Sequence, residues 1–443
     1  MLLLSALLVA GATQVGAVVG GPPSPAPVGQ DGPVDTITSP GGPLGAVSAG
    51  RDRLDRAIGT WSANLAANAR DFLSATNLGL LYEARARLSG DVSDYERANQ
   101  ALDRALAIEP GHLPAQLARA RVLLANHDFA AALDGARAIE DAAPDQPAVL
   151  ALIADAQLAL GDIDAAERIF IRLTEVVPGP PVSARLAQVA FLRGHSGQAL
   201  ELAERAFFGA EAAGLAGPSL SWYAQFCATI AGATGQPETA LRWSDRALGL
   251  WPQSYVASAV RGRVLARMGR VDEAIMWYER SAAIVPQPAT LAGLGDLYAV
   301  RGDDDAAAAQ YAAVEALIQL AATGEQVYAR EFVHFLVDHG RDPAAALEMA
   351  EAELRLRRDI YAHDAVAWAL MANDRAREAD EMMARALALG TADAMLYYHA
   401  GVIARSVGDD ARARQLLTSA LSQPAALDPL AARRARAELD ALP

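Results

Sequence analysis

The sequence predicts an all-α protein, a solenoid of about ten helix–turn–helix repeats with a C-terminal capping helix. The first observation is a proline period of 34 residues, seen at Pro110, Pro144 and Pro178 and again at Pro252 and Pro286. A period of this length is typical of stacked helical pairs. The second is the content of hydrophobic residues, 52%, much of it alanine, which has the highest helix propensity. The third is a glycine between two amphipathic stretches in most periods.

The first fifty residues differ from the rest. Leu2 to Val19 is an uncharged apolar run, which predicts a signal peptide or N-terminal anchor over residues 1–19. Seven prolines between residues 20 and 50 predict a disordered, Pro/Gly-rich tether. We therefore expect an exported protein, either extracytoplasmic or secreted. It contacts a membrane only if the N-terminal segment remains uncleaved.

Paired helices are expected over residues 51–427. The second helix of each of ten pairs is predicted to end near residues 110, 144, 178, 211, 252, 286, 319, 357, 391 and 424. The first pair carries an insertion around Ser89 to Val92, and a six-residue insertion lies near Glu211 to Leu220. Residues 428–443 are expected to form the capping helix, with Arg433, Arg434 and Arg436 on a solvated face.

One repeat illustrates why these residue types recur. A small residue on the first helix, Gly262, lets the second helix approach, and Ala274 is expected to be its partner in that contact. Gly269 allows the positive φ that ends the first helix. Pro286 follows the second helix because proline cannot continue it.

The motif Leu294-Gly295-x-x-Tyr298 is close to the signature of the tetratricopeptide-repeat (TPR) family, and the chain resembles that family over residues 70–425. The resemblance implies a right-handed solenoid that binds a protein or peptide in its concave groove. The chain also resembles exported bacterial members of the family. It departs from the pattern at His127, where glycine is usual, and at Thr391, where proline is usual.

By this resemblance, certain positions of the first helices face the groove. In the C-terminal half these positions hold arginines and aromatic residues, which are common interface anchors. The predicted groove residues are Arg263, Arg267, Asp296, Arg330, His334, Trp368, Tyr398 and Arg405. The arginines favour an acidic or carboxylate-bearing peptide. The carboxylate clamp of the heat-shock-protein-binding members uses paired Lys and Asn, and this chain contains no lysine.

The composition argues against nucleic-acid binding and against several classes of enzyme. The net charge of −15 disfavours a nucleic-acid partner, since phosphates need a basic face. Without lysine the chain cannot form a P-loop, a kinase site or a pyridoxal-phosphate Schiff base. The single cysteine, Cys227, is expected to be a buried and inert thiol. We therefore predict no enzyme and no cofactor.

No metal site is predicted either. His334 and His339 are five residues apart, about 140° around a helix, which is poor for sharing one ion even with Asp338 and Asp342 nearby. The acidic run Asp303–Asp305 is expected to cap a second helix rather than bind calcium.

Two alternatives to the groove scaffold remain open. One is a structural scaffold that self-associates through its ends or its convex face. The other is an enzyme, which would require a bound metal or cofactor.

Overall fold

The computed structural model describes residues 51–443 apart from residues 92, 322–328 and 423–426. This part of the chain contains 22 helices and no strand, so the all-α prediction is confirmed. The segments predicted for residues 1–19 and 20–50 lie outside the described residues. None of the helices described is both long enough and apolar enough to cross a membrane.

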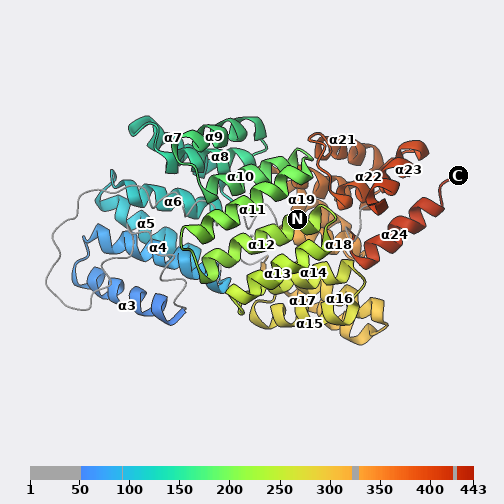
Figure 1. Ribbon diagram of the computed structural model, residues 1–443, viewed down its shortest axis with the longest axis horizontal. Coiled ribbons are helices and arrows are strands. Elements are labelled where there is room, and N and C mark those ends of the chain that lie inside the picture. The colour runs from blue at the N-terminus through green and yellow to red at the C-terminus, as the bar shows by residue number, and fades with distance from the viewer. Residues whose placement is uncertain (1–50, 92, 322–328, 423–426) are drawn as a thin grey trace. The chain divides into compact units, whose positions relative to one another are not determined.

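The helices of the chain are drawn in Figure 1. They divide into two compact units. Of the described residues, the N-terminal unit comprises those from 51 to 185 together with Glu211–Ser219, and the C-terminal unit comprises those of Leu186–Ala210 and Leu220–Pro443. The first three predicted repeats form helical pairs in the N-terminal unit. Their helices are α4 (Phe72–Ser89), α5 (Ser93–Ile108), α6 (Leu113–Ala125), α7 (Phe129–Ala142), α8 (Pro147–Ala159) and α9 (Ile163–Val176), and α3 (Arg51–Ala67) precedes them.

Helix α10 (Pro180–Leu192) begins in the N-terminal unit and ends in the C-terminal unit. The remaining helices continue the pairing. They are α11 (Ser196–Ala212), α12 (Gly217–Ala233), α13 (Pro237–Leu250), α14 (Tyr255–Arg267), α15 (Val271–Ile284), α16 (Pro288–Arg301), α17 (Asp304–Ala321), α18 (Ala329–Asp338), α19 (Pro343–Leu356), α20 (Ile360–Ala372), α21 (Ala376–Ala386), α22 (Ala394–Ser406), α23 (Asp410–Ser422) and α24 (Pro429–Asp440).

The turn inside a pair depends on one residue with left-handed backbone. Gly269 has φ 75° and Gly302 has φ 84° in this position. His127, which replaces the usual glycine, adopts φ 63°, and Asp374 adopts φ 58°. The predicted left-handed turn is therefore kept where the sequence departs from glycine.

The two helices of a pair pack closely because a glycine on the first helix leaves room for a large side chain of the second. A Cβ atom added at Gly262 would lie 2.7 Å from the Tyr278 ring, and one added at Gly295 would lie 2.5 Å from the Tyr311 ring. The expected partner of Gly262 was Ala274. That expectation is corrected, because Ala274 is fully buried but the nearest atoms belong to Tyr278, one helical turn further on.

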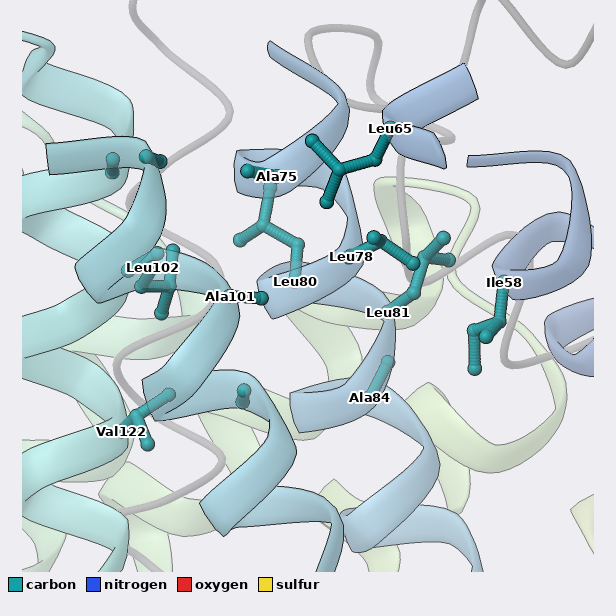
Figure 2. Packing of buried hydrophobic residues seen from close by; sticks show 14 of the residues in the cluster. Ile58, Leu65, Ala75, Leu78, Leu80, Leu81, Ala84, Ala101, Leu102 and Val122 are labelled. Atoms are coloured by element: carbon teal, nitrogen blue, oxygen red, sulfur yellow. The ribbon is translucent and has the colours of Figure 1, made fainter. Parts of the chain in front are cut away.

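The N-terminal unit has a core of small and branched aliphatic side chains. Leu81 of α4 and Ile58 and Leu65 of α3 belong to this cluster, as do Leu102 of α5 and Val122 of α6 (Figure 2). The core runs continuously through α3 to α6, so α3 packs as an additional helix before the first pair.

Within the C-terminal unit, the turn after α10 meets the turn after α21. The hydroxyl of Thr391 donates a hydrogen bond of 2.5 Å to the carbonyl oxygen of Leu192, and Gly194 lies against the carbonyl of Gly390. Thr391 is the position where the repeat pattern has proline. The threonine hydroxyl makes a contact that proline has no group to make.

The capping helix α24 is present as predicted. Arg433, Arg434 and Arg436 are exposed, which confirms the solvated face, while Ala435 is fully buried. The helix contacts α22 and α23 of the last repeat and also α16, which is three repeats earlier. It therefore lies across first helices as well as ending the stack.

Candidate functional site

The eight side chains predicted to bind a partner lie on five consecutive first helices of the C-terminal unit. Each of these helices contacts the next, in the order α14, α16, α18, α20 and α22. We call the eight residues the first-helix face. They are Arg263 and Arg267 on α14, Asp296 on α16, Arg330 and His334 on α18, Trp368 on α20, and Tyr398 and Arg405 on α22.

Two arginines of this face bind carboxylates of the capping segment. The guanidinium of Arg267 lies 3.3 Å from the Asp428 carboxylate, and that of Arg405 forms an ion pair with Glu438. Asp428 is the N-cap residue of α24 and Glu438 lies in its last turns. The capping helix is thus tied to α14 at one end and to α22 at the other.

Arg330 has a different environment, since it is only 4% exposed. Its guanidinium lies 2.6 Å from Glu353 of α19 and 3.4 Å from Asp359. Burial would raise the pKa of Asp359, but Arg330 and Arg357 lower it to about 2. Asp359 also accepts hydrogen bonds from the backbone N–H groups of Tyr361 and Ala362 and so caps α20. Arg330 is therefore part of a buried ionic brace between repeats.

Arg263 and Asp296 hydrogen-bond the tyrosines that fill the pairs. Arg263 bonds the hydroxyl of Tyr278, whose pKa burial raises to about 12. Asp296 accepts hydrogen bonds of 2.8 Å from the Tyr311 hydroxyl and from Nε2 of His339. Burial alone would lower the pKa of His339, but the Asp296 carboxylate raises it.

His334, Trp368 and Tyr398 meet in a polar aromatic cluster. The Trp368 indole donates a hydrogen bond of 2.9 Å to Asp338, and its ring stacks on His399 with centroids 4.2 Å apart. The His334 and His399 rings are 5.5 Å apart and nearly parallel. Tyr398 packs against Trp368 at 5.7 Å.

Sequence reasoning missed two members of this cluster, Asp364 and His399. Nδ1 of His399 lies 2.8 Å from Asp364 Oδ1, and both residues are buried. Each occupies the second turn of its first helix, as His334 does in α18. A polar residue in the same turn of three consecutive first helices is the pattern that would have indicated them.

Polar first-helix residues of the N-terminal unit are also paired internally. Asp155 accepts two hydrogen bonds, of 2.8 and 2.7 Å, from the buried Arg185, and Arg121 lies 3.0 Å from Glu83. Burial raises the pKa of Asp155, with Arg185 opposing it. These pairs join neighbouring repeats. They are stabilising contacts within the stack.

Two further expectations are confirmed. Cys227 is fully buried, and burial raises the pKa of its thiol well above the ordinary value. Asp303 accepts the backbone N–H of Ala306 at 3.2 Å, so the acidic run caps α17.

Comparison with known families agrees with this architecture. Family models described as the tetratricopeptide repeat match residues 91–155, 123–189 and 228–289. These segments include α5 to α9 and α13 to α15. No curated protein matches the chain.

Three solved structures align with much of the chain. The crystal structure of the APC/C hetero-tetramer Cut9–Hcn1 aligns with a TM-score of 0.52 at 15% identity, over 84% of this chain and 73% of that one. Yeast Tom70 aligns with a TM-score of 0.36 at 13% identity, over 87% and 92%. The human IFIT1 dimer with PPP-AAAA aligns with 0.46 at 12% identity, over 95% and 94%. Only the first value exceeds 0.5, and at 15% identity it shows the fold alone.

Proposed function

Because the chain is a tetratricopeptide-repeat protein, with a fold typical of protein–protein interaction, we propose that it is a non-catalytic scaffold of the cell envelope. Its partner is a protein or peptide that binds in the concave groove of the repeats, at Arg267 and Arg405 of the first-helix face. The uncharged run Leu2 to Val19 supports the envelope location.

The contact between the arginines and α24 carries this proposal. Arg267 and Arg405 each bind one carboxylate, and Asp428 and Glu438 are ten residues apart in sequence. Ten residues of helix span about 15 Å. Arg267 and Arg405 therefore already bind two carboxylates of one helical segment. By analogy with α24, the partner would carry two carboxylates at a similar spacing.

These two ion pairs are suited to exchange. The Arg267 and Asp428 side chains are 16% and 42% exposed, and those of Arg405 and Glu438 are 37% and 32% exposed. Solvent-exposed ion pairs contribute about 0–1 kcal/mol each, a value that applies to Arg405 and Glu438; Arg267 is mostly covered, and only its partner Asp428 is exposed. A partner with carboxylates at similar spacing can replace them at little cost, whereas the buried pairs of Arg330 stay in place.

Two reciprocal double variants test the proposal. Arg267→Ala with Arg405→Ala, and Asp428→Asn with Glu438→Gln, remove the same two ion pairs to α24. Only the first also removes the cations that would bind the partner. Each protein is immobilised and the protein captured from cell-envelope extract is quantified against wild type.

We expect the arginine variant to lose about tenfold or more of its captured partner. A bound partner would shield these ion pairs from water, and hydrogen bonds to charged groups then contribute about 1.5–3 kcal/mol each. The carboxylate variant should keep or increase capture, because α24 no longer competes. Equal capture by the two variants would contradict the proposal. Arg433→Ala with Arg436→Ala, on the exposed side of α24, is the control for surface charge.

The self-associating scaffold is the second candidate, and one observation favours it. The site that binds α24 is on the chain itself, so α24 of a second copy would fit the same site. Light scattering across concentration tests this directly. A stable dimer that is lost on substituting Arg267 and Arg405 would favour self-association over a separate partner.

A further inference from the structure

Three metal-ligating side chains converge from three consecutive repeats. His334 of α18, Asp364 of α20 and His399 of α22 each offer one ligand atom, and the three atoms lie within 4.8 Å of one another. Asp364 Oδ2 is 3.9 Å from His334 Nε2, and Asp364 Oδ1 is 2.8 Å from His399 Nδ1. This is the one such group found among the residues that the structure describes.

The two imidazoles retain unused nitrogen atoms. Nε2 of His399 and Nε2 of His334 are buried and have no hydrogen-bond partner among the described residues. His399 is fully buried and His334 is 8% exposed. Buried polar atoms are normally hydrogen-bonded, so each of these nitrogens calls for a partner. The His334 nitrogen is the one that faces Asp364, at 3.9 Å, where a ligand would sit.

The charge around the cluster also suits a cation. The carboxylates of Asp364, Asp338 and Asp393 interact electrostatically with His399, whereas Arg330 is the one arginine among the main charged neighbours of His334.

We propose that His334, Asp364 and His399 form a binding site for a divalent first-row transition metal, with Zn²⁺ the best match. Two imidazoles and one carboxylate are the donor set of catalytic-type zinc sites and of non-haem iron sites, and they leave at least one coordination position open. A partner side chain or water can fill that position.

The geometry requires only local movement. Zinc–nitrogen and zinc–oxygen bonds of about 2.0–2.2 Å place neighbouring ligand atoms about 3.3 Å apart. The Asp364–His399 distance of 2.8 Å is already shorter than this, and the His334–Asp364 distance of 3.9 Å exceeds it by about 0.6 Å. All three ligand atoms lie within 4.8 Å of one another, so the side chains have to move inward to share one ion. The metal would take the place of the proton between Asp364 and His399, so binding releases a proton. The bound metal ion would link α18, α20 and α22.

Zn²⁺ titration of the full, metal-free chain by calorimetry is the test. We expect one Zn²⁺ per chain and a higher melting temperature with Zn²⁺ than with chelator. Co²⁺ substitution should give a visible absorption band. His334→Gln and Asp364→Asn should each weaken Zn²⁺ binding at least about a hundredfold, since even residues that only support ligands contribute 10–100-fold.

A histidine outside the cluster provides the control. His195 is exposed, on the turn between α10 and α11, so His195→Gln should leave Zn²⁺ affinity unchanged. His334 is the least buried ligand, and melting of the metal-free His334→Gln protein checks that it folds. The proposal is overturned if wild type binds no stoichiometric Zn²⁺, or if His334→Gln binds it as tightly as His195→Gln does.

Discussion

At the scale of single residues, the first-helix face consists of side chains that have partners within the chain. Sequence reasoning found the positions of Trp368 and Arg330, because a polar or aromatic residue is unusual where packing favours alanine. It did not find the partners Asp338 and Asp359, which lie on neighbouring repeats. The identity of a partner depends on how far each repeat is rotated against the next, and a single sequence does not specify that rotation.

The ionic brace at Asp359 predicts a dependence of stability on pH. Its pKa in the folded protein is about 2, below the ordinary value of 3.8. Its stabilising effect is therefore full above pH 4 and is lost as pH falls towards 2. This contributes about 2 kcal/mol, at 1.36 kcal/mol per pKa unit.

Asp359→Asn keeps an acceptor for the α20 N-cap and removes the charge. In urea unfolding, wild type should be more stable than the variant at pH 6, and that difference should shrink by about 2 kcal/mol by pH 2.5. A difference that is independent of pH would show that the Asp359 charge does not stabilise the fold.

At the scale of the helices, the sequence predicted the pairs and their turns well. Proline spacing and glycine position depend on local backbone chemistry, and that chemistry determines where a helix ends. The residue that packs against the glycine inside a pair was harder to predict from the sequence. Gly262 was correctly predicted as the close contact, but Tyr278 rather than Ala274 fills it, because either residue faces the first helix at helical spacing.

Gly262→Ala tests this packing. The added Cβ would lie 2.7 Å from the Tyr278 ring, so we expect a loss of about 1–3 kcal/mol in the free energy of unfolding. Gly249→Ala, in the exposed face of α13 with no atom within 4 Å, should instead stabilise by about 0.5–1 kcal/mol. Chemical unfolding compares the two, and equal effects would refute the packing.

At the scale of the whole molecule, the ten repeats and the capping helix followed from the period. Two long-range contacts did not. Thr391 bonds Leu192 across 199 residues of sequence, and α24 reaches Arg267 on α14. Both result from small rotations added over several repeats, so no local pattern encodes them. Thr391, which replaces the usual proline of the repeat, is a local sequence signal for the first of these contacts.

Gly194→Ala measures the contact between the α10–α11 turn and the α21–α22 turn. The new methyl would meet the Gly390 carbonyl, and φ is 76°. Gly269→Ala has the same backbone strain, at φ 75°, but no atom within 4 Å. Thermal unfolding should show Gly194→Ala to be less stable than Gly269→Ala by about 1–3 kcal/mol. Equal stabilities would contradict the contact.

The central claim is that Arg267 and Arg405 bind the carboxylates of a partner in the place of α24. The most direct measurement is the ratio of partner captured by the Asp428→Asn/Glu438→Gln protein to that captured by the Arg267→Ala/Arg405→Ala protein. Both proteins lose the same contacts to α24. We predict a ratio of about ten or more, and a ratio near one would contradict the account.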